Sequence, residues 1–220
     1  MSTFNDIDIE CPECGEKYRG TVWVGVHAGQ DPELKDLLLG GELNLVSCPE
    51  CAQVAFQEHF LIYQEPAADL VAYVYPEGQR ESETELRRLM LSGFQEAQGQ
   101  MPAKYHLDYE PVLMFGLESL IELLEREIEI AEQSQIAQLI CKVNQIATFV
   151  LRPYRARQLE TVRVLPVVGD KPVPEGAEVI AGIDRLLSLN PALDLYAQLR
   201  DRIKADANWS LDSDAEKAKL

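Results

Sequence analysis

Two pairs of cysteines constrain this chain more than any other feature of its sequence. Cys11 and Cys14 enclose a Pro-Glu dipeptide, and so do Cys48 and Cys51. Zinc takes four ligands in a tetrahedron, and a Cys-x-x-Cys turn places two thiolates along one edge of it. Two such turns supply all four ligands. The spacing therefore predicts one zinc ion per chain, bound by Cys11, Cys14, Cys48 and Cys51.

The residues beside the cysteines favour the same turns. The proline in each pair fixes one φ angle and removes a backbone donor, so the turn is partly formed before a metal arrives. Gly15 follows the first pair and can adopt the positive φ angle that such a turn requires. Ala52 stands at the equivalent place after the second pair, where we expect a small local strain.

The cysteine set has two chemical interpretations. A catalytic zinc site keeps one position open for water, whereas four protein ligands close the site, so the set favours a structural zinc. The alternative is a thiol-based redox protein or sensor that uses the Cys-x-x-Cys pairs as dithiols. Redox motifs of this kind usually occur singly at the start of a helix, and here two pairs follow predicted strands.

The segments around and between the two pairs extend the pattern. The additional positions are residues 31–38, residues 41–44, Tyr63 and residues 73–76. With the two Cys-Pro-x-Cys turns, this stretch of about residues 7–76 resembles the CpXC domain, a small prokaryotic family with a zinc-ribbon-like domain. The resemblance implies a fold and a bound metal, and it implies no molecular function.

The first part of the chain has the alternation of β-structure. Strands are expected over 6–10, 18–27, 43–47, 54–63 and 70–75. Asp31 and Pro32 begin one short helix between them, and Gly40 ends it. We therefore predict an α+β protein whose domain 1–78 is a small antiparallel zinc-ribbon-like sheet with one inserted helix.

Helical periodicity dominates the predicted second domain, residues 79–220. Helices are expected over 81–98, 177–189 and 191–205, with a short strand near 160–168. Between 110 and 151, two apolar runs at helical spacing differ in phase near residues 133–135. That mismatch leaves two alternatives, one kinked helix or a helical hairpin.

The distribution of charge limits the partners of the first domain. The chain carries a net charge of −17, and residues 1–76 hold 13 acidic but only 3 basic side chains. Nucleic acid and anionic membranes are therefore not expected as partners, since both attract basic clusters. The odd cysteine count, the absence of a signal peptide and the absence of a membrane span favour the cytoplasm.

Two charged groups occur in the second domain. Acidic side chains follow one helical stripe at Glu118, Glu122, Glu125 and Glu129, and the basic cluster comprises Arg152, Arg155, Arg157 and Arg163. The cluster could bind the acidic stripe, a phosphate or an acidic partner. No phosphate loop, nucleophile elbow or dinucleotide fingerprint is present, which favours a module that binds another protein or itself over an enzyme.

Overall fold

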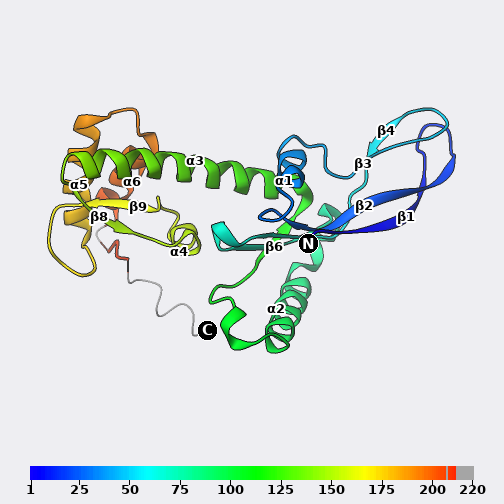
Figure 1. Cartoon of the computed structure of the whole chain (residues 1–220), viewed down its shortest axis with the longest axis horizontal. Helices are drawn as coiled ribbons and strands as arrows, with labels where there is room; N and C mark the ends of the chain where they lie inside the picture. The colour runs from blue at the N-terminus through cyan, green and yellow to red at the C-terminus, as the bar shows by residue number, and fades with distance from the viewer. Residues whose placement is uncertain (207, 212–220) are drawn as a thin grey trace. The chain divides into compact units, whose positions relative to one another are not determined.

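The computed structural model describes residues 1–206 and 208–211 and divides the chain into two compact units (Figure 1). Unit 1 is Met1–Glu125 and unit 2 is Arg126–Leu220. The sequence placed the boundary after residue 78 instead. The difference arises because a strand and a helix beyond residue 78 complete the sheet and the core of unit 1.

Unit 1 contains a five-stranded sheet with the order β1-β2-β5-β6-β7. Its strands are β1 (Thr3–Glu10), β2 (Lys17–His27), β5 (Leu61–Glu65), β6 (Leu70–Tyr75) and β7 (Val112–Phe115). Strands β1 and β2 pair antiparallel, as do β5 and β6, whereas β2 pairs with β5 and β6 with β7 in parallel. The sheet is thus mixed and not purely antiparallel as expected.

The two parallel pairs follow from the connections between their strands, since parallel neighbours need a long crossover. Between β2 and β5 the chain forms α1 (Pro32–Leu39) and a separate antiparallel pair, β3 (Leu45–Ser47) with β4 (Val54–Phe56). Between β6 and β7 it forms α2 (Glu83–Gly99). Short 3₁₀ turns lie at Pro66–Ala68, Glu77–Ser82 and Ala103–Tyr105.

The core of unit 1 lies between the sheet and two helices. Helix α1 buries Leu34 and Leu38, and the beginning of α3 (Gly116–Val143) adds Leu120 and Leu124. These leucines pack in one cluster with strand residues that include Tyr63. The apolar faces predicted for these helices therefore cover the sheet.

Residues 110–151 form neither of the two predicted arrangements in full. Leu113 lies in β7 opposite Tyr73, and α3 then starts at Gly116, whose φ angle is +72°. Helix α3 is one element of 28 residues that continues through Ser134. Residues expected at the end of the second helical run form β8 (Ala147–Val150) instead.

Unit 2 packs three further helices with a two-stranded sheet. Its elements are β8, α4 (Pro153–Gln158), β9 (Val164–Val167), α5 (Gly176–Leu189) and α6 (Asp194–Ala205). The strand near 160–168 and both carboxy-terminal helices are confirmed. Tyr196 is fully buried and its hydroxyl donates to the Val164 carbonyl at 2.7 Å. Gly182 lets α5 approach β9, since a Cβ there would lie 2.1 Å from the Pro166 carbonyl oxygen.

Among the described residues, none of the helices combines the length and apolar character needed to cross a membrane.

Candidate metal centre

The four cysteines lie in two turns that are distant in sequence and adjacent in unit 1. The turn between β1 and β2 carries Cys11 and Cys14, and the turn between β3 and β4 carries Cys48 and Cys51. All four sulfur atoms lie within 4.8 Å of one another. Two of the separations that cross between the turns are 3.6 Å, from Cys11 to Cys51, and 3.7 Å, from Cys14 to Cys48.

These distances fit a tetrahedron around an ion. With Zn–S bonds of about 2.3 Å, the edge of a regular tetrahedron of sulfurs is about 3.8 Å. A disulfide would bring its sulfurs to about 2.0 Å, and all five cysteines are free. The four cysteines could therefore hold a metal ion, and they lie where the spacing predicted.

The two turns share one backbone pattern. Cys11 N–H donates to Glu16 O at 2.8 Å, and Gly15 N–H donates to Cys11 O at 2.9 Å. The second turn repeats these bonds, from Cys48 to Gln53 at 2.8 Å and from Ala52 to Cys48 at 3.0 Å. The residue after each pair is left-handed, with φ of +74° at Gly15 and +57° at Ala52. A related backbone thus presents each pair of sulfurs.

We expect Ala52→Gly to raise the free energy of unfolding by about 0.5–1 kcal/mol. A left-handed alanine costs about 1–2 kcal/mol, and glycine removes this cost. Part of the gain is offset because glycine loses more backbone conformational entropy when the chain folds. The reverse change, Gly15→Ala, is the matched control and should destabilise by a similar amount, because a Cβ there meets nothing within 4 Å and only the φ angle is strained. Urea denaturation of both variants measures the effect. Two shifts of the same sign would contradict the expectation.

Burial and charge differ among the four thiols. Cys11 and Cys48 are buried, while Cys14 and Cys51 are exposed. Backbone N–H groups of Cys14 and Glu13 lower the pKa of Cys11 to about 7. The Glu16 N–H also lowers the pKa of Cys14, but desolvation and the neighbouring thiols outweigh it and raise that pKa to about 12. A metal ion would therefore displace protons from this cluster as it binds.

Of the acidic stripe, Glu118 and Glu122 line the groove described below, Glu125 ends unit 1, and Glu129 lies in unit 2. The fifth cysteine, Cys141, is buried in the core of unit 2. Within unit 2, two members of the basic cluster pair with a carboxylate outside the predicted acidic stripe. Arg157 Nε and Arg163 Nη2 bind the buried carboxylate of Glu127, at 3.0 and 2.6 Å. The sequence reasoning missed Glu127.

Comparison with known proteins points to one family. The family model described as CpXC protein matches residues 9–135, which is more than half of the chain and includes all four cysteines. This match confirms the resemblance seen in the sequence and extends it well beyond residue 76. No curated protein and no solved structure matches the chain.

Proposed function

The chain belongs to the CpXC protein family, and we propose that it is a zinc-binding protein whose unit 1 binds another protein. One structural zinc per chain would be bound by Cys11, Cys14, Cys48 and Cys51. The observation that carries the zinc assignment is the gathering of four sulfurs within 4.8 Å. Soft thiolates in a tetrahedral set favour zinc, and four protein ligands leave no open position for catalysis.

A metal here would fix the β3–β4 pair against the end of β1 and β2, because each turn contributes two ligands. The pair has only three residues in each strand. Its register places Leu45, Val54 and Phe56 on one face, where their exposed fractions are 44%, 51% and 44%. The metal would thus hold an exposed apolar face in position.

That face continues into a groove of about 620 Å³ in unit 1, which Phe56 also lines. We name it the acidic groove. Its apolar lining includes Leu38, Leu43, Phe115, Leu117 and Ile121. Its acidic lining is Glu58, Glu77, Glu118 and Glu122. Arg80 also lines it but is paired with Glu77 at 2.5 and 2.8 Å, so the groove retains a negative charge.

The combination of apolar floor and carboxylates determines the partner that fits the acidic groove. A protein segment with both basic and apolar side chains would bury its apolar groups and pair its charges there. A second copy of this chain is disfavoured by its net charge of −17. We therefore propose a basic, apolar segment of a different protein as the occupant.

The mass of the native protein, isolated under reducing conditions without chelator, tests the metal assignment. We expect a mass increase of one zinc per chain with all thiols reduced. A metal-free chain that has lost paired hydrogens would contain disulfides and would favour the redox alternative. That alternative is supported by the exposure of Cys14 and Cys51 and by the pKa of about 7 at Cys11.

Matched substitutions test the acidic groove as the interaction surface. Glu122→Lys and Phe56→Ser should each release a co-purified partner, by reversing a charge and by removing an apolar contact. Glu125→Lys and Leu89→Ser are the controls, because both residues are exposed and neither lines the groove. Native mass spectrometry counts the complexes. A partner retained by all four variants would contradict this site and leave the zinc assignment intact.

A further inference from the structure

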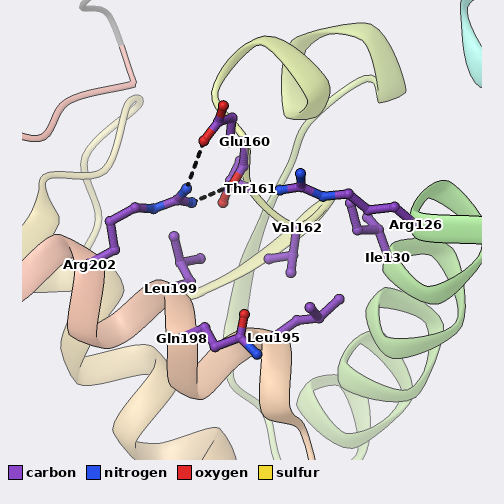
Figure 2. A pocket seen from close by; sticks show the side chains of 9 residues that line it. All are labelled: Arg126, Ile130, Glu160, Thr161, Val162, Leu195, Gln198, Leu199 and Arg202. Atoms are coloured by element: carbon purple, nitrogen blue, oxygen red, sulfur yellow. Dashed lines mark hydrogen bonds and ion pairs between the residues drawn. The ribbon is translucent and has the colours of Figure 1, made fainter. Parts of the chain in front are cut away.

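Unit 2 contains a cavity of about 190 Å³ that neither the cysteines nor the acidic groove involves (Figure 2). Arg126 from α3 and Arg202 from α6 extend toward Thr161 from opposite sides of it. Apolar side chains of Val162, Leu195 and Leu199 lie on the other side of these polar groups. We propose that this cavity binds a small organic acid, with its carboxylate between the two arginines and its apolar body among the leucines.

The hydroxyl of Thr161 gives the first argument for a ligand. Thr161 lines the cavity and is only 3% exposed, and its Oγ1 has no hydrogen-bond partner within the described part of the chain. A buried hydroxyl without a partner is costly, so most such groups in proteins are satisfied. A carboxylate oxygen in the cavity would accept this hydrogen bond and remove the cost.

The charges around the cavity give the second argument. Arg202 is held by Glu160, with Nη1 3.7 Å from Oε2 and Nη2 donating to the Glu160 carbonyl. Across residues 1–206 and 208–211, no ion pair is found for Arg126. Two guanidinium groups and one carboxylate leave one net positive charge. One ligand carboxylate would balance it, and guanidinium binds carboxylate well through paired hydrogen bonds.

The apolar lining gives the third argument, because it favours an organic acid over an inorganic anion. Besides the two leucines and Val162, Ile130 lines the cavity, so its apolar part offers no donor to a phosphate or sulfate oxygen. Gln198 is the remaining polar side chain in the lining. A hydrocarbon body the size of a phenyl ring or a short alkyl chain would instead be stabilised by leaving water.

Calorimetric titration of the full chain with benzoate and with hexanoate tests the proposal. We expect one saturable site with a Kd of about a millimolar or lower, as befits a small ligand with one charged group. Arg126→Gln should weaken binding about tenfold, by removing a charged hydrogen bond. Thr161→Val should also weaken it severalfold without lowering the melting temperature, because it deletes an unpaired buried hydroxyl and keeps the shape.

Arg185→Gln is the control, since Arg185 is exposed in the same unit and lies outside the cavity; its affinity for benzoate should equal that of the parent chain. Three results would each overturn the proposal. The first is no binding of either acid at 10 mM benzoate or hexanoate, which is roughly tenfold above the expected Kd. The second is an unchanged affinity in both Arg126→Gln and Thr161→Val. The third is that inorganic phosphate, or the neutral analogue benzyl alcohol, binds as tightly as the acids.

Discussion

Cys48→Ser is expected to abolish stoichiometric zinc binding and to lower the free energy of unfolding of unit 1 by several kcal/mol. A structural zinc contributes on the order of 10 kcal/mol, whereas a whole domain is stable by about 5–15 kcal/mol. Serine cannot replace a thiolate ligand at neutral pH, because its hydroxyl does not ionise. Metal analysis and urea denaturation of the variant measure both effects.

The loss should be uneven across unit 1. Hydrogen exchange should accelerate most over residues 9–18 and 45–56, which form the two turns and the strands beside them. The β5–β6 pair should retain more protection, because its Leu61 and Tyr63 are fully buried and its five register pairs involve no cysteine.

Cys141→Ser is the control for a buried thiol without a metal role. It places a hydroxyl in the core of unit 2 and should destabilise that unit, yet the chain should keep one zinc. A Cys48→Ser variant that retained one zinc and its original unfolding free energy would contradict the metal site.

The cysteine cluster could be predicted because its information is local. A Cys-Pro-Glu-Cys turn determines where two sulfurs point, and four thiols at that spacing have few chemical uses. The positive φ angle at Ala52 was also foreseeable from its alignment with Gly15. The acidic groove was not, because Phe56, Phe115 and Glu122 come from three separate elements that only the fold brings together.

The sheet topology was harder to predict than the strands. Alternation of polar and apolar residues has the same period in parallel and antiparallel strands, so it does not reveal pairing direction. The apolar run of β7 continues directly into α3, and a single glycine, Gly116, marks the junction between them. The apolar runs at helical spacing between 110 and 151 therefore do not show where the strand ends and the helix begins.

The burial of Glu127 could have been predicted from the spacing of the sequence. The buried positions along α3 are spaced by three and four residues, at Leu120, Leu124, Glu127, Ile130, Ser134, Ala137 and Cys141. A carboxylate within such a stripe must be buried, and burial of a charge requires a partner of opposite sign. The glutamates of the acidic stripe are exposed, so water solvates their charge, whereas the buried Glu127 pairs with Arg157 and Arg163.

Glu127→Ala is expected to destabilise unit 2 by about 3–5 kcal/mol, because it removes a buried carboxylate that is paired with both Arg157 and Arg163. The side chains of Glu127, Arg157 and Arg163 are only 8%, 14% and 20% exposed. Arg163 Nε is already buried without a partner among the residues that the structure describes, so water does not readily replace the lost contact. Urea denaturation followed by Trp209 fluorescence, in a Trp23→Phe background, reports on unit 2.

Two further variants test whether the destabilisation by Glu127→Ala comes from the lost charge pairing or from the lost packing. Glu129→Ala, exposed on the same helix, should change stability by less than about 0.5 kcal/mol, since it loses only a 3.3 Å hydrogen bond from Gln133. Replacing Glu127, Arg157 and Arg163 together by methionine should recover most of the loss, because an apolar set of similar volume carries no desolvation penalty. If the triple variant is as unstable as Glu127→Ala, the cost comes from lost contacts, and the charges have no stabilising role beyond their packing.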